Sequence, residues 1–65
     1  MIDGNKVRKL LKDKKMTVAE LARRVGVTRS MMGYICQGLR DTTTTNLERI
    51  AATLGVPADE LIVKE

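Results

Sequence analysis

The sequence has a single cysteine, Cys36, and no histidine. No disulfide can therefore form within the chain, and the Cys/His ligand sets of zinc fingers are absent. The Ser/His and Cys/His pairs on which nucleophilic catalysis usually depends are missing too, and 65 residues leave little volume for a pocket shielded from water. We therefore expect a protein that is not an enzyme, holds no metal or cofactor and has no small-molecule substrate.

Long apolar runs are also absent. No stretch approaches the roughly 20 apolar residues that span a bilayer, and the polar segment Met1 to Asn5 does not resemble a signal peptide. We expect a soluble, cytoplasmic protein with no membrane partner. Its 65 residues form one domain, 1–65, close to the lower size limit at which a single hydrophobic core keeps a chain folded.

Positive charge is concentrated in the first forty residues. They carry ten Lys or Arg against three Asp or Glu, whereas residues 41–65 carry two against five, for a net charge of +4. A polyanion bound to the N-terminal part would release counterions as its phosphates are neutralised, which supplies affinity for any sequence. For Lys12, Lys14 and Lys15 an ordinary solvated helix face is an equally good interpretation.

Apolar residues recur at helical spacing along the chain, and no stretch shows sustained two-residue alternation. The first helix is predicted from about Gly4 to Lys14, with Asp3 as its N-cap. The second begins at a Thr-x-x-Glu capping box, in which Thr17 and Glu20 satisfy each other's backbone amides. It stops at Gly26, a residue that tolerates the left-handed conformation of a helix C-cap.

The connection to the third helix is only about three residues long, which is typical of a helix-turn-helix corner within 17–37. Thr28 caps this helix, which runs to about Cys36 and ends near Gly38. Two further helices are expected: one opening at Thr43 or Thr45 and ending at Gly55, and one starting at Pro57. The sequence thus predicts an all-α, compact five-helix domain.

The third helix has two different sides. Because a helix turns about 100° per residue, Met31, Met32 and Ile35 fall on an apolar side, with Cys36 on its border. The other side carries hydrogen-bonding groups and no acid that would repel phosphate, and it consists of Arg29, Ser30, Gly33, Tyr34 and Gln37. This side suits the major groove of double-stranded DNA, which would place the segment from Thr28 to Gln37 there. A polar side is also what any amphipathic helix exposes to solvent.

Each residue of the outward side suits a role on DNA. Arg29, in the first turn, can hold a guanine in a bidentate pair worth roughly 1–3 kcal/mol of discrimination. Ser30 and Tyr34 can reach base edges, and Gln37 at the helix end suits a phosphate. A glycine costs a helix about 1 kcal/mol relative to alanine, so Gly33 requires a reason, which is either close approach to the groove floor or helix packing.

The stretch TVAELARRVGVTRSMMGYI at 17–35, with Gln37-Gly38, Leu54-Gly55-Val56 and Asp59-Glu60-Leu61, resembles the lambda-repressor-like, Cro/CI-type (XRE) helix-turn-helix family. The resemblance covers nearly the whole chain. It implies a five-helix domain whose third helix reads the major groove, usually as a homodimer on a palindromic operator. Base reading is then expected from Arg29, Ser30, Gly33 and Tyr34, and phosphate contacts from Thr17, Val18, Thr28, Gln37 and Arg40.

Three positions depart from that family's pattern. Val18 stands where glutamine is frequent, so backbone amides at the start of the second helix are left to hold a phosphate. Cys36 replaces a frequent glutamate and removes a negative charge near the DNA. Asp41-Thr42 replaces a frequent Asn-Pro, which predicts a more mobile loop around Arg40.

Taken together, these features predict a sequence-specific DNA-binding transcription regulator, acting as a repressor. The alternative is a protein-interaction module on the same fold, such as an antitoxin or partner-binding regulator, with Tyr34 as an anchor because tyrosine is enriched at interfaces. A homodimer interface is expected at the fifth helix, with Val56, Ile62 and Val63 as its candidates.

Overall fold

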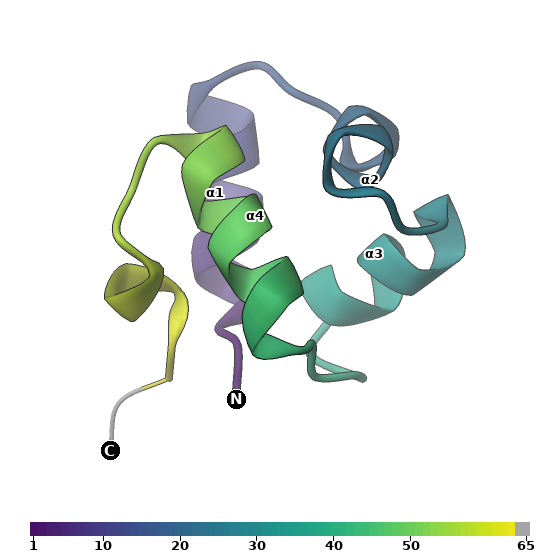
Figure 1. The fold of residues 1–65 in the computed structure, drawn as a ribbon. Coiled ribbons are helices and arrows are strands. Elements are labelled where there is room, and N and C mark those ends of the chain that lie inside the picture. The colour runs from purple at the N-terminus through teal and green to yellow at the C-terminus, as the bar shows by residue number, and fades with distance from the viewer. Residues whose placement is uncertain (64–65) are drawn as a thin grey trace.

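This computed structural model describes residues 1–63 of the chain. These residues contain four α-helices and one 3₁₀ turn (Figure 1). In chain order they are α1 (Gly4–Asp13), α2 (Val18–Val25), α3 (Arg29–Cys36), α4 (Thr44–Leu54) and η1 (Ala58–Leu61). The all-α prediction is confirmed for these residues.

The expected fifth α-helix is instead the 3₁₀ turn η1, which has only four residues. Pro57 precedes it in an extended conformation and makes no side-chain cap. Directly after η1, Ile62 returns to extended backbone and forms an antiparallel bridge with Ile2. Because Ile62 is already paired with the other end of the chain, the turn cannot be prolonged into an α-helix.

Side-chain caps set the start of each α-helix. The hydroxyls of Thr17, Thr28 and Thr43 each accept the backbone amide three residues further on at 3.1 Å, and the Asp3 carboxylate does the same at 3.2 Å. Of the two caps considered for α4, Thr43 is therefore the one used. The capping box of α2 is closed differently from the prediction, since the Glu20 carboxylate accepts from the Thr17 hydroxyl at 3.5 Å instead of from its amide.

The corner between α2 and α3 is fixed from both sides. Gly26 ends α2 with φ 91°, a left-handed conformation that glycine adopts without a steric penalty. From α4, the guanidinium of Arg49 donates to the carbonyl of Val25 at 3.3 Å. This bond satisfies a free carbonyl at the end of α2 with a cation, which the helix dipole favours.

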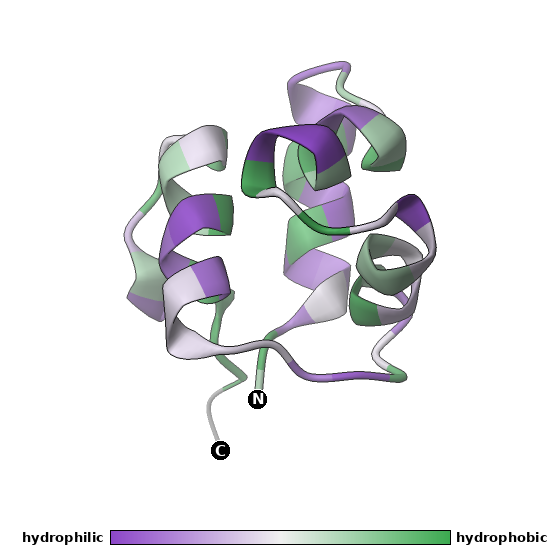
Figure 2. Cartoon of the chain, turned by 45° about the vertical axis from the view of Figure 1, so that its right-hand side comes forward, coloured by the Kyte–Doolittle hydropathy of each residue, from purple (hydrophilic) through white to green (hydrophobic). Residues whose placement is uncertain are grey.

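The helices bury their apolar sides against one another, and hydrophobic and hydrophilic stretches alternate along the ribbons (Figure 2). Packing occurs between α2 and α3, α2 and α4, α1 and α3, and between η1 and both α1 and α4. The core consists of Ile2, Val7, Leu11, Leu21, Ala22, Val25, Met32, Ile35, Cys36, Ile50, Ala51, Leu54 and Leu61. Since α3 is held by α1 and α2, one of its sides stays free.

The two ends of the described chain run side by side. The Asp3 amide donates to the Leu61 carbonyl at 2.6 Å, and the Val63 amide donates to the Met1 carbonyl at 3.0 Å. Of the residues expected at a dimer interface, Val63 is 51% exposed, whereas Val56 packs against the core. None of the helices within residues 1–63 has both the length and the apolar character needed to cross a membrane.

Candidate nucleic-acid interface

The free side of α3 lines a groove on the protein surface, which we call the α3 groove. Its lining consists of Val18 at the start of α2 together with Arg29, Ser30, Gly33, Tyr34 and Gln37. On the opposite side of the helix, Met32, Ile35 and Cys36 are buried. The structure therefore brings all four expected base readers together and places Val18 and Gln37, two of the expected phosphate contacts, beside them.

Gly33 is an open position in the middle of the α3 groove. A Cβ built on it would meet no atom within 4 Å. The helix-packing explanation for this glycine is therefore wrong, because no neighbouring helix approaches it. What the missing side chain leaves free is space in the groove, available to a molecule outside the protein.

Thr28 and Thr17, both expected to contact phosphate, lie at the N-caps of α3 and α2. The Thr28 hydroxyl accepts the Met31 amide, which leaves its own hydrogen available as a donor. The Thr17 hydroxyl accepts the Glu20 amide and donates to the Glu20 carboxylate at 3.5 Å. At the start of α2, a phosphate contact would therefore depend on backbone amides more than on this hydroxyl.

Cys36 belongs to the core and not to the border of the apolar side, where its helical angle placed it. Its side chain is 3% exposed. Burial raises the pKa of the Cys36 thiol, and the positive charge of Arg8 acts in the opposite direction. Since the thiolate is the reactive form, this burial gives no support to the redox role that a lone cysteine can have.

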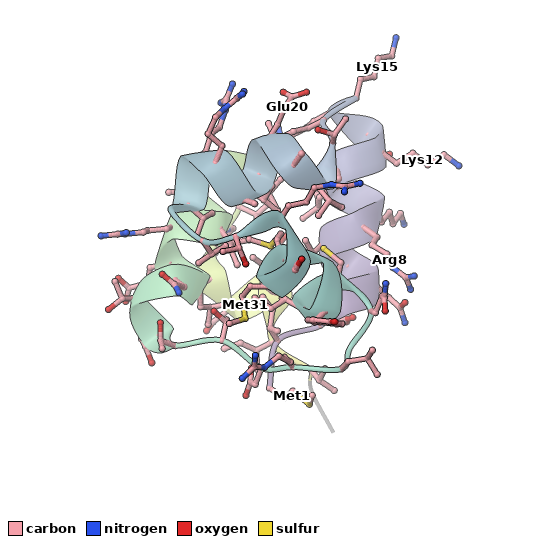
Figure 3. All side chains as sticks on the ribbon, turned by 90° about the vertical axis from the view of Figure 1, so that its right-hand side faces the viewer. Met1, Arg8, Lys12, Lys15, Glu20 and Met31 are labelled. Atoms are coloured by element: carbon pink, nitrogen blue, oxygen red, sulfur yellow. The ribbon has the colours of Figure 1, made fainter. Side chains whose placement is uncertain are left out.

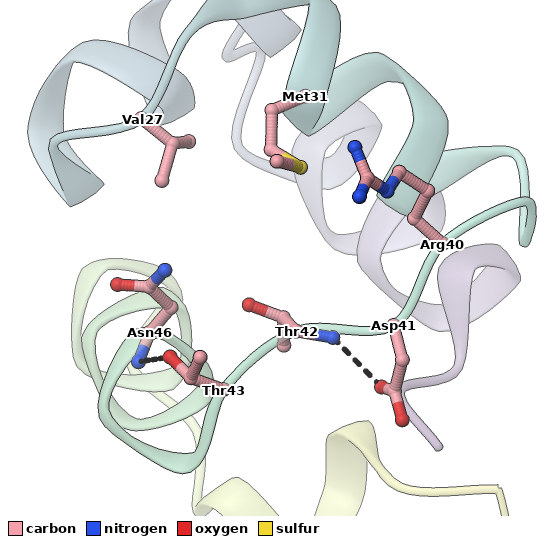
Figure 4. A pocket seen from close by; sticks show the side chains of 7 residues that line it. All are labelled: Val27, Met31, Arg40, Asp41, Thr42, Thr43 and Asn46. Carbon is pink, nitrogen blue, oxygen red and sulfur yellow. Dashed lines mark hydrogen bonds between the residues drawn. The ribbon is translucent and has the colours of Figure 1, made fainter.

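Arg40, the remaining expected phosphate contact, lies apart from the α3 groove in a second groove between α3 and the start of α4 (Figure 4). Its neighbours along this groove include Met31, Thr43 and Asn46. In the close-up the Arg40 side chain extends from the loop toward α3, and its guanidinium lies next to the Met31 side chain. Residues with predicted DNA contacts thus line two separate grooves, both of which include residues of α3.

The loop that carries Arg40 has an anchor that its sequence did not suggest. The Asp41 carboxylate accepts the Ile2 amide at 3.0 Å and the Thr42 amide at 2.9 Å. These two hydrogen bonds, with the one from Ile2 the stronger influence, hold the pKa of Asp41 below its ordinary value. Asp41, which departs from the Asn-Pro pattern at 41–42, therefore holds the loop to Ile2 near the start of the chain.

Comparisons with known proteins agree on one family. A protein-family model described as helix-turn-helix matches residues 7–61. The restriction-modification controller protein C.AhdI from Aeromonas hydrophila is 29% identical, with a TM-score of 0.84 over 91% of this chain and 89% of that one. SinR, the master regulator for biofilm formation, in complex with DNA is 28% identical, with a TM-score of 0.79 over 86% of this chain and 90% of that one.

A complex of the SinR and SinI proteins also contains a similar chain, 29% identical with a TM-score of 0.86. The match covers 98% of this chain but 62% of that chain. A search of curated proteins gave no significant match. Because the family model spans residues 7–61 and the fold agrees with these regulators throughout, the chain belongs to the helix-turn-helix family, in its Cro/CI-type branch of DNA-binding transcription regulators.

Proposed function

We propose that the protein represses transcription by binding double-stranded DNA of defined sequence, with α3 in the major groove. The α3 groove is the observation that carries this proposal, since its lining offers hydrogen-bonding side chains and no acid. An α-helix with side chains is about 10–12 Å across and the major groove is about 12 Å wide, so the two fit.

Base reading is assigned to Arg29, Ser30, Gly33 and Tyr34. Arg29 is exposed in the first turn of α3, where its planar fork can hold O6 and N7 of a guanine. Ser30 and Tyr34 are exposed on the same side and can donate to or accept from base edges. Gly33 leaves room for the helix backbone to approach a base or a thymine methyl group.

Phosphate contacts are assigned to both flanks of α3. The backbone amides at Thr17 and Val18 stand at the N-terminus of α2, where unpaired amides and the helix dipole favour an anion. Thr28 contributes its hydroxyl hydrogen and Gln37 its amide group at the end of α3. Arg40 approaches the other flank from the loop before α4.

A homodimer on a palindromic operator would give this small domain its specificity. One such module buries only about 600–1,000 Å² on DNA, and two half-sites about 34 Å apart multiply the discrimination. SinR is described in complex with DNA and, in another structure, with SinI. Binding of a protein partner through the same fold, with Tyr34 (47% exposed) as an anchor, is the alternative function.

Selection from a random duplex library tests the proposal. We expect enrichment of one sequence whose two halves are related by two-fold symmetry and spaced by about one helical turn. The selected duplex should bind tightly at about 50 mM salt, where phosphate contacts are strongest. A protein that binds no duplex at that salt concentration would contradict the proposed function and leave the protein-interaction alternative in its place.

A further inference from the structure

A row of positive side chains follows α1 beside α3. Arg8 and Lys12 are exposed and lie four residues apart, which brings them to one side of α1. The exposed Lys15 follows α1, which ends at Asp13, and has a positive φ of 54°. Figure 3, which looks directly at α2 and α3, shows the three one above another along the edge formed by α1. We call these residues the α1 basic row.

Within residues 1–63, no acidic side chain pairs with the α1 basic row. No ion pair between described residues involves any of its three members, and Arg8 donates a hydrogen bond only to the neutral side chain of Asn5. Asp13, the acid of α1, lies about 140° around the helix from Arg8. Like charges four residues apart repel on a helix, so Arg8 and Lys12 gain nothing from each other unless an anion lies between them.

Both ends of the row adjoin residues that line or border the α3 groove. Arg8 lies close enough to the end of α3 for its charge to act on Cys36, the residue before Gln37. At the other end, Lys15 is two residues before Thr17, the N-cap of α2, which is followed by Val18. The row therefore connects the two places where the proposed function puts phosphates, at Gln37 and at the start of α2.

We propose that the α1 basic row binds the phosphates of the DNA strand that borders the α3 groove, which extends the footprint past the bases read by α3. The proposal depends on the proposed function. Arg8 and Lys12 are about 6 Å apart along the helix axis at 1.5 Å per residue, and one DNA strand presents a phosphate about every 3.4 Å of axis. The row also supplies the positive charge that Val18 cannot offer beside the start of α2.

Two variants with equal loss of charge test the row. The first is Arg8→Gln with Lys12→Gln. The second is Lys6→Gln with Lys14→Gln, which removes one charge from another side of α1 and one from its C-cap. Lys14 in particular points toward Gly55 at the end of α4. Binding of each variant to the selected duplex is measured between about 50 and 200 mM salt. Circular dichroism melting verifies that both variants are folded.

For the row variant, the slope of log K against log salt concentration should become shallower by about 1.8, because each phosphate contact contributes about 0.9. The control variant should keep the slope of the parent protein, and both should select the same base sequence. Equal slopes in the two variants would overturn the proposal while duplex binding by the parent persisted. Failure of the parent to bind any duplex would instead overturn the proposed function, and the role of the row with it.

Discussion

Gly4 lies directly against the backbone carbonyl of Cys36. A Cβ on Gly4 would come to 2.5 Å from the Cys36 oxygen and 2.7 Å from the Ile35 oxygen. The contact joins the first turn of α1 to the last turn of α3. Backbone-to-backbone packing of this kind lets the two helices approach closely, and it sets how the recognition helix is seated on the core.

Replacing Gly4 with alanine should destabilise the fold. Alanine is the better helix former by about 1 kcal/mol, but its methyl group would overlap a carbonyl that cannot rotate away. Overpacking of this kind costs typically about 1–3 kcal/mol, so we expect a net loss of unfolding free energy, measured by urea denaturation. An unchanged or increased stability of Gly4→Ala would show that α1 moves away from α3 without cost.

Gly33→Ala should have the opposite effect on stability. The position is in the helix interior, and a Cβ there would meet nothing within 4 Å, so alanine should add about 0.5–1 kcal/mol. Affinity for the selected duplex should fall, because the added methyl group occupies the space assigned to the groove floor. Both quantities are measured on one variant: a gain in stability with unchanged affinity would remove Gly33 from the reading surface.

Features that depend on local contacts could be predicted from the sequence, whereas the contact of Gly4 with α3 could not. The caps at Thr17, Thr28 and Thr43 depend on contacts three residues apart, and helical angle depends only on position, so helix starts and the free side of α3 were predictable. The Gly4 contact joins residues 32 positions apart in the chain, and no local pattern reports it. Cys36 was placed on the border of the apolar side for the same reason, since its burial depends on tertiary packing at the end of α3 where Gly4 of α1 contacts it.

The fifth helix and the loop at 41–42 show the same limitation. Pro57 followed by acids is typical of a helix start, yet pairing of Ile62 with Ile2 stops the turn after four residues. The anchor at Asp41 spans 39 residues of sequence to Ile2. Both contacts are made by Ile2 with residues far along the chain, and neither can be found from local sequence preference.

Arg29→Ala should weaken binding to the selected duplex by roughly 1–3 kcal/mol and relax the preference at one base pair. The loss follows from removing a bidentate contact to one base. The measurement compares binding to the selected site with binding to duplexes that differ at single positions. Arg24→Ala is the control, because Arg24 is exposed on α2 but does not line the α3 groove. An Arg29→Ala protein with every base preference intact would contradict the assignment.

The anchor at Asp41 should make stability depend on pH. Hydrogen bonds from the Ile2 and Thr42 amides lower the pKa of the folded carboxyl below its ordinary value of 3.8. The native state therefore favours the carboxylate. The resulting stabilisation is fully present above the unfolded pKa, and it is lost as the pH falls through the lower, folded pKa.

Asp41→Asn and Asp41→Ala separate the charge of this anchor from its hydrogen bonds. Asparagine keeps an acceptor oxygen but loses the negative charge. Asp41→Asn should therefore be less stable than the parent at about pH 6, and the difference should shrink as the pH is taken below the unfolded pKa. Alanine removes the acceptor as well, and Asp41→Ala should stay less stable than the parent at both ends of that range. Urea denaturation across the series measures all three proteins. A deficit of Asp41→Asn that is the same at every pH would show that the negative charge of Asp41 has no part in holding the loop to Ile2.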